Sequence, residues 1–164
     1  MATQADWRQW LNDHSPKLLL FARQQARCEA DAHDLVQEAV LEAIQRSPSG
    51  ELPALPLVFA TIHRRAIDLA RREDRRAARQ FRILEHAPAA WFDHEVEARE
   101  YNQLIQDAMT QLPEIYREVI TLKVWGELTF AEIAEALQIP ANTAASRYRY
   151  GLEALRKLTK EVMA

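Results

Sequence analysis

Hydrophobic residues along this chain recur at intervals of three and four, the spacing of one face of an α-helix. The strict alternation typical of a half-buried strand is scarce, and there are only 3 glycines among 164 residues. The pattern therefore predicts an all-α protein. The predicted helices cover about 4–14, 16–26, 31–46, 57–82, 97–112, 114–125, 130–137 and a last stretch that ends near 160. Ser15-Pro16 is expected to separate the first two.

The last two predicted helices form the clearest local pattern. Thr129 and Glu132 have the spacing of a capping box, so the first helix should begin at Phe130. Pro140 should end it, because the residue before a proline is disfavoured in the α conformation. A short helix, a tight turn and a longer cationic helix are typical of a helix-turn-helix that places its second helix in the DNA major groove. A plain helical hairpin with a solvated arginine face is the alternative.

Individual residues are expected to fix the helix ends and the buried faces. Asp31 is a candidate N-cap for helix 31–46, Asn142 or Thr143 can cap the last helix, and Gly126 should stop helix 114–125. Spacing predicts these inward-facing residues in the C-terminal helices: Tyr101, Leu104, Ile105, Ala108, Leu112, Ile115, Val119, Leu122, Ala144, Tyr148, Leu152 and Leu155.

Charge is distributed unevenly along the chain, although the net charge is only −3. Residues 63–82 contain eight arginines and three carboxylates, and residues 141–160 contain five cationic residues and one carboxylate. Two separate basic stretches on an acidic body favour contact with nucleic acid at two places. Helix 31–46 instead carries Asp34, Glu38 and Glu42 as exposed groups, which suits a protein partner with a basic surface. Ordinary solvated helix faces would also explain such runs.

The chain is expected to consist of two small helical domains. Residues 47–56 are rich in proline and form a loop, and residues 83–96 lack clear periodicity and contain Pro88. We therefore assign residues 1–82 to an N-terminal domain, 83–96 to a flexible linker that includes Trp91 and Phe92, and 97–164 to a C-terminal domain of four helices.

Five stretches together resemble a known family, the bacterial RNA polymerase sigma factors of the extracytoplasmic-function (ECF) type. They are DAHDLVQE at 31–38, RAIDLARR at 65–72, LPEIYREV at 112–119, EIAEALQIP at 132–140 and TAASR at 143–147. The first resembles the region that binds the polymerase clamp, and the second resembles the region that reads the minus-10 element. The chain departs from the family pattern at Arg64, where Asn is usual, at Gln138, which replaces a turn glycine, and at Ala145, which replaces a lysine.

The resemblance implies a transcription initiation factor that binds core RNA polymerase and directs recognition and melting of promoter DNA. An anti-sigma factor is a further candidate partner. The implied core polymerase-binding residues are Asp31, Asp34, Leu35, Gln37, Glu38 and Leu41. The implied minus-10 residues are Phe59, Arg64, Arg65, Asp68, Arg71 and Arg72, with Phe59 near an unstacked base. The implied minus-35 residues are Asn142, Thr143, Ser146, Arg147 and Arg149.

Several other classes of protein do not fit the sequence. Cys28 is the single cysteine, so we expect no internal disulfide and no metal cluster. The sequence contains no paired-carboxylate site, no nucleophile with a base and no glycine-rich phosphate loop, which predicts a protein that is not an enzyme and needs no cofactor. It has no signal peptide pattern and no apolar run of membrane-spanning length, so we expect a cytoplasmic protein. A stand-alone helix-turn-helix regulator and a helical protein-binding adaptor remain as alternatives.

Overall fold

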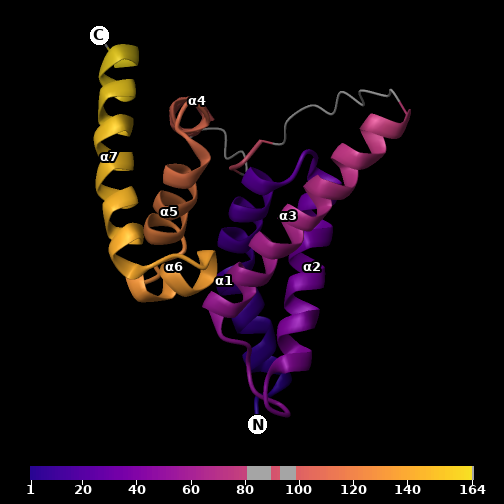
Figure 1. The fold of residues 1–164 in the computed structure, drawn as a ribbon. Coiled ribbons are helices and arrows are strands. Elements are labelled where there is room, and N and C mark those ends of the chain that lie inside the picture. Colours follow the sequence, from indigo (N-terminus) through magenta and orange to yellow (C-terminus); the bar gives the residue numbers. More distant parts are fainter. Residues whose placement is uncertain (81–89, 93–98, 164) are drawn as a thin grey trace. The chain divides into compact units, whose positions relative to one another are not determined.

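The computed structural model describes residues 1–80, 90–92 and 99–163, which contain seven α-helices (Figure 1). These described residues contain no strand, and the prediction of an all-α protein is confirmed. The chain divides into two compact units, Met1–Ala90 and Trp91–Ala164. Most of the predicted linker lies outside the described residues.

Trp91 and Phe92 were predicted to lie in the linker, but they contact the C-terminal unit. The backbone N–H of Trp91 donates a hydrogen bond to Gln106 Oε1 at 3.0 Å. The Arg117 guanidinium lies 5.7 Å from the centroid of the Trp91 ring, and the Phe92 and Trp125 ring centroids are 5.7 Å apart. These aromatic contacts attach both residues to the C-terminal unit, a placement that the local sequence around them does not show.

The N-terminal unit contains α1 (Gln4–Gln25), α2 (Glu29–Arg46) and α3 (Leu55–Gln80), which pack against one another. Phe21 of α1 and Phe59 of α3 meet edge to face, with ring centroids 5.5 Å apart. The side chains buried around them are Leu18, Leu20, Ala22, Ala32, Leu35, Ala39, Ala43, Val58 and Ile62. Three of the four buried residues of α2 are alanines, which let this helix approach its neighbours closely.

The predicted break at Ser15-Pro16 is wrong, because α1 continues from Gln4 to Gln25 with Pro16 inside it. The helix begins with a capping box in which Thr3 and Asp6 bond to each other's backbone N–H groups. Trp10 before the proline and Leu18 after it are both buried. Burial of one apolar stripe along the whole helix can offset the roughly 3 kcal/mol that an interior proline costs.

The start of α2 also differs from the prediction. Cys28 occupies the N-cap position and Asp31 lies in the first turn, so Asp31 is not the N-cap. Arg23 of α1 donates hydrogen bonds to both carboxylate oxygens of Glu29, the closest at 2.7 Å. This ion pair joins the end of α1 to the first residue of α2 and fixes the helix start through a contact that spacing alone does not reveal.

The C-terminal unit contains α4 (Arg99–Thr110), α5 (Glu114–Val124), α6 (Phe130–Leu137) and α7 (Ala141–Met163), which confirms the four predicted helices. Its buried side chains include Ala108, Met109, Leu112, Val119, Ile120, Leu122, Leu128, Ile133, Ala136, Leu137 and Ala144. Tyr101 and Ile115 were predicted to face inward, but both are exposed.

The turn after α5 places glycine and positive φ at different residues. Gly126 follows the C-cap Trp125, and its N–H donates to the Thr121 carbonyl at 3.0 Å. A Cβ atom at Gly126 would lie 2.6 Å from the Leu122 carbonyl oxygen, so close backbone approach requires glycine there. The left-handed conformation belongs to Glu127, with φ 57°. α5 thus ends before Gly126, as predicted, and close backbone approach is the reason for glycine there.

Candidate nucleic-acid interface

The capping box at the start of α6 is confirmed. Thr129 Oγ1 accepts a hydrogen bond from the Glu132 N–H at 3.2 Å, and the Glu132 carboxylate accepts one from the Thr129 N–H at 3.0 Å. The helix begins at Phe130, as predicted. The Lys123 amine lies 4.6 Å from the centroid of the Phe130 ring, which in turn lies 5.6 Å from the ring of Tyr148 on α7. These contacts connect the start of α6 to both neighbouring helices.

A three-residue turn joins α6 to α7. Gln138 ends α6 in the left-handed region with φ 57° and ψ 48°, and its N–H donates to the Ala134 carbonyl. Pro140 directly precedes α7, whose first residue is Ala141. Asn142 and Thr143 therefore lie in the first turn of α7, and neither is the N-cap that we predicted. The two helices and this tight turn form the predicted helix-turn-helix.

The outward face of α7 carries the polar groups that we assigned to DNA contact. Ala144 is buried against the unit, Ser146 and Arg147 are half-buried, and Arg149 is exposed. The Arg149 guanidinium lies 5.0 Å from the centroid of the Tyr150 ring and donates a hydrogen bond to the Tyr150 hydroxyl at 3.3 Å. Arg149 thus lies off the apolar stripe of α7, and its guanidinium is held against a neighbouring exposed aromatic ring.

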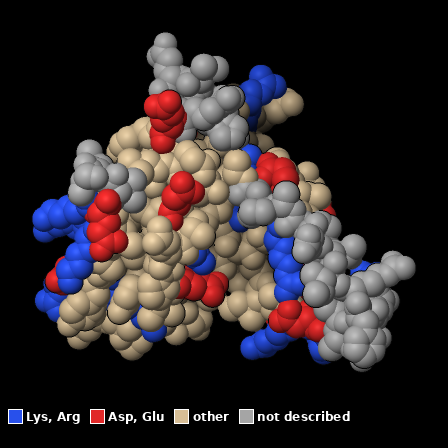
Figure 2. Space-filling view, turned by 90° about the horizontal axis from the view of Figure 1, so that it is seen from above, with Lys and Arg blue, Asp and Glu red and all other residues tan. Residues whose placement is uncertain are grey.

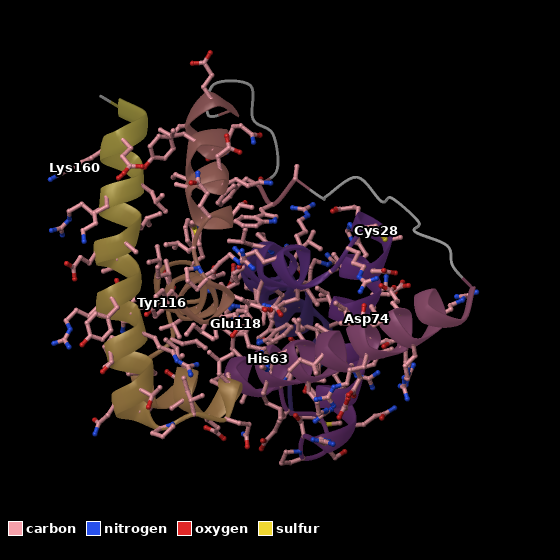
Figure 3. The ribbon with its side chains drawn as sticks, turned by 45° about the horizontal axis from the view of Figure 1, so that its top comes forward. Cys28, His63, Asp74, Tyr116, Glu118 and Lys160 are labelled. Carbon is pink, nitrogen blue, oxygen red and sulfur yellow. The ribbon has the colours of Figure 1, made fainter. Side chains whose placement is uncertain are left out.

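Gly151 sets how closely α7 approaches α5. A Cβ atom at this position would lie 2.9 Å from Ile120 Cδ1 and 3.0 Å from Tyr116 Cβ. Figure 3 shows Tyr116 beside the middle of α7 and Lys160 near its C-terminal end. The packing role of Gly151 was not predicted from the sequence. The available signal was a glycine inside a helical pattern, which costs about 1 kcal/mol relative to alanine and so points to a packing role.

The second candidate surface is the C-terminal half of α3, which projects beyond α1 and α2 (Figure 1). The exposed charged side chains of this part are Asp68, Arg71, Arg72, Asp74, Arg75 and Arg76. Five of them line a shallow, open depression of about 520 Å³: Asp68, Arg71, Arg72, Asp74 and Arg75. Figure 2 shows basic and acidic side chains interspersed on the face that it presents, so the cationic surface is local.

Two carboxylates in this half of α3 are paired with Arg27, which lies in the turn between α1 and α2. Arg27 Nε lies 3.1 Å from Glu73, and Arg27 Nη2 lies 2.5 Å from Asp74. Figure 3 places Asp74 on α3 and Cys28, the neighbour of Arg27, at the junction of α1 and α2. Because one arginine from the turn between α1 and α2 pairs with both carboxylates, the projecting arginines keep a net positive field.

The N-terminal half of α3 is different, because its arginines pair with α2. Glu42 of α2 contacts Arg46, Arg64 and Arg65, and Glu38 contacts Arg65. The side chain of Glu42 is only 13% exposed, which corrects the expectation that it is a solvated group. Burial raises the pKa of Glu42, but hydrogen bonds from Arg64 and Arg65 outweigh this and hold the pKa below its ordinary value of 4.5.

Phe59 was assigned to an unstacked base, but its side chain is 1% exposed and packs against Phe21. A ring that is part of the hydrophobic core cannot stack on a base without unpacking the unit. Phe59 therefore belongs to the core, and its assignment to an unstacked base is wrong. Its inward position on the same stripe as Ile62 and Ala66 agrees with the helical spacing.

The acidic face of α2 is also only partly as expected. Leu35 was assigned to polymerase binding, but it is 3% exposed and belongs to the core. Asp34, Gln37, Glu38 and Leu41 are exposed, and Asp31 is half-buried. Leu41 is 59% exposed, and Ile44, which we did not assign to the site, is exposed one turn further along. Positions 34, 37, 41 and 44 lie on one helix face, which combines apolar and acidic groups.

The described part of the chain contains no group of three His, Cys, Asp or Glu side chains that could hold a metal ion. None of the helices in that part is both long enough and apolar enough to span a membrane.

Both units match parts of one known family. The Sigma-70 region 2 family matches residues 10–76, and the Sigma-70 region 4 family matches residues 102–158. The ECF RNA polymerase sigma factor SigL of Mycobacterium tuberculosis is 30% identical over 169 residues, which cover 98% of this chain and 93% of SigL. The chain belongs to the ECF sigma factors. The resemblance seen in the sequence is thereby confirmed, and the chain is a promoter-directing RNA polymerase sigma factor.

Two further comparisons agree with this family. The ECF sigma factor SigW of Bacillus subtilis is 43% identical over 63 residues, a match that covers 38% of this chain and 34% of SigW. The sigma factor RpoE of Bartonella quintana, solved in complex with the anti-sigma factor NepR, has the same fold with a TM-score of 0.71. It is 21% identical, and the match covers 94% of this chain and 97% of that one. Because the chain matches both sigma regions, the two alternatives, a stand-alone regulator and a protein-binding adaptor, are not favoured.

Proposed function

We propose that three surfaces of this ECF sigma factor divide the work of promoter recognition. The exposed face of α2, with Asp34, Gln37 and Leu41, binds core polymerase. The projecting arginines of α3 contact the promoter backbone near the minus-10 element. The N-terminal half of α7, with Ser146, Arg147 and Arg149, contacts the minus-35 element. Helices offer arginine side chains to phosphate and to guanine edges in this way.

The observation that carries this proposal is the placement of two cationic helix surfaces on two separate compact units. Arg71, Arg72, Arg75 and Arg76 are exposed on α3, and Arg149 is exposed on α7. Each unit matches a different sigma region. One chain with two such surfaces can contact two separated promoter elements, whereas one helix-turn-helix alone contacts one.

The proposal extends to partners and location. A protein that acts with RNA polymerase on promoter DNA works in the cytoplasm as a non-catalytic initiation factor. An anti-sigma factor is a further proposed partner, because RpoE of the same fold was solved with one. The flexible linker between the units stays a prediction at residues 83–96, of which Trp91 and Phe92 contact the C-terminal unit.

The proposed docking face can be tested by charge reversal with a matched control. Asp34→Arg should weaken binding to core polymerase at least several-fold in a pull-down, because it places a cation on the face that suits a basic partner. Glu51→Arg makes the same change of charge at an exposed loop position and should bind normally. Circular dichroism should show unchanged helix content in both variants. Equal binding by Asp34→Arg and Glu51→Arg would refute the docking assignment.

The function as a whole is tested by salt-dependent binding to promoter DNA with and without core polymerase. We expect specific binding and strand opening only with the core enzyme. Tight specific binding to duplex DNA by the chain alone would instead support a stand-alone regulator, and binding to neither would support an adaptor.

A further inference from the structure

Arg64 and Arg65 are neighbours in α3, and sequence analysis assigned both to promoter DNA, but their guanidinium groups have different surroundings. Arg65 Nε and Nη2 each lie 2.9 Å from Glu42 Oε2, and Arg65 Nη1 donates to Glu38 Oε2 at 2.8 Å. Carboxylates of α2 therefore engage Arg65 through all three of its guanidinium nitrogens. A guanidinium bound in this way has little capacity left for a phosphate.

Arg64 reaches the same carboxylate from the other side and with a single nitrogen. Its Nη2 lies 2.5 Å from Glu42 Oε1, and 49% of its side chain is exposed. Glu42 Oε1 also lies 2.9 Å from Arg46 Nη2. One nearly buried carboxylate thus contacts a single nitrogen of Arg64, and about half of the Arg64 side chain stays exposed.

The distinction rests on the pairing of these groups and not on an excess of charge. Arg46, Arg64 and Arg65 are balanced by Glu38, Glu42 and Asp68, the last of which lines the same depression as Glu42 and Arg64. Isolated surface ion pairs contribute little to stability, but a network with near-buried members and several charge-assisted hydrogen bonds contributes more. If Arg65 moved to bind a phosphate, it would break its contacts with both Glu38 and Glu42 and so weaken the packing of α2 on α3. Arg64 can bind an anion and still keep its contact with Glu42.

We propose that Arg65 is a structural brace that fastens α3 to α2, and that Arg64, positioned by Glu42, is the member of the pair that contacts promoter phosphate. Glu42 is then a positioning residue that belongs to neither the docking face nor the DNA surface. This inference rests on the proposed function, because it concerns which cation of α3 takes part in promoter contact.

The adjacent arginines provide their own matched control. Arg64→Gln and Arg65→Gln each remove one positive charge at neighbouring positions and retain most of the side-chain stem. The measurement is the salt dependence of open-complex formation by the holoenzyme. The logarithm of the observed equilibrium constant is plotted against the logarithm of the salt concentration. Arg64→Gln should reduce the slope by about 0.7–0.9, the value for one lost phosphate contact, and Arg65→Gln should leave it unchanged.

In thermal unfolding we expect the larger effect from Arg65→Gln and the smaller one from Arg64→Gln. Arg65→Gln should lower the melting temperature of the N-terminal unit by about 4–8 °C, and Arg64→Gln should change it much less. Glu42→Gln should lower it as well, and the double variant with Arg65→Gln should lose less than the sum of the two, because the residues belong to one network. If Arg65→Gln fails to fold while Arg64→Gln folds, the brace is equally supported.

Three results would overturn the inference. They are equal slope changes in both variants, no slope change in Arg64→Gln, and unchanged melting temperature in Arg65→Gln. Failure of the proposed function is distinguishable from these results, because it would appear in the wild-type protein itself as an absence of open complexes with core polymerase.

Discussion

Replacing Gln138 by glycine should stabilise the C-terminal unit, although the residue lies in the turn of the helix-turn-helix. Gln138 has φ 57° and ψ 48°, a conformation that costs a residue with a Cβ atom roughly 1–2 kcal/mol. Glycine removes this cost but adds about 0.5–1 kcal/mol through the greater freedom of the unfolded chain. The exposed hydrogen bond from Gln138 Nε2 to the Glu135 carbonyl, at 2.9 Å, is lost as well and offsets little.

The net gain should therefore be about 0.5–1 kcal/mol, which corresponds to a rise of about 2–8 °C in the melting temperature of a unit of this size. Thermal unfolding by circular dichroism measures the shift, and hydrogen exchange of peptides from α6 and α7 assigns it to the C-terminal unit. Gln138→Ala is the control, since it loses the same hydrogen bond but keeps the Cβ atom, and it should give no gain. A loss of stability in Gln138→Gly, or an equal gain in Gln138→Ala, would refute the reasoning.

The remaining predictions concern the surfaces and one ion pair. Replacing Arg71 and Arg72 by alanine should reduce the salt slope of open-complex formation by about 0.7–0.9 for each lost phosphate contact, and normal permanganate reactivity of the minus-10 region at raised salt would contradict this. Arg149→Ala should cost about 1–3 kcal/mol at one base pair of the minus-35 element in transcription from a promoter library, whereas an equal loss at every promoter would indicate a phosphate contact. Hydrogen bonds from Arg23 hold the pKa of Glu29 below its ordinary value of 4.5, so the stability from this pair is present above that pH and is lost as pH falls through the lower folded-state pKa. Urea unfolding should thus show Glu29→Gln less stable than wild type at pH 7, with the difference shrinking in acid, and a difference that is constant with pH would exclude the ion pair as its source.

Much of the fold could be predicted because the helices are long and strongly periodic. The end of α2 at Arg46 and the start of α6 at Phe130 were predicted to the residue, the latter from a capping box that acts within four residues. The misplaced features depend on longer-range contacts. Pro16 reads locally as a helix start, but burial of residues on both sides of it keeps α1 continuous.

The candidate site was less predictable, because exposure depends on which helix face meets another helix. Leu35 and Leu41 are similar residues in the same acidic helix, yet one is in the core and the other is at the surface. Their difference of six positions places them on different faces, and the choice between these faces depends on where α1 and α3 pack. Phe59 illustrates the same limit, since an aromatic ring near a cationic helix suits either a base or a core.

The distribution of charge on α3 shows why a local count of arginines overestimates the DNA surface. Arg64 and Arg65 lie more than 20 positions from Glu42, so no window of sequence centred on the arginines includes the carboxylate that pairs with them. Towards the C-terminal end, the acidic residues Glu73 and Asp74 lower the local count of positive charge, but both are paired with Arg27 from the turn between α1 and α2. The first half of α3 is therefore largely neutralised, whereas the second half stays cationic. Since phosphate contact scales with the number of available cations, the salt dependence of minus-10 binding should come mainly from Arg71, Arg72, Arg75 and Arg76, with Arg64 as the one contribution from the first half.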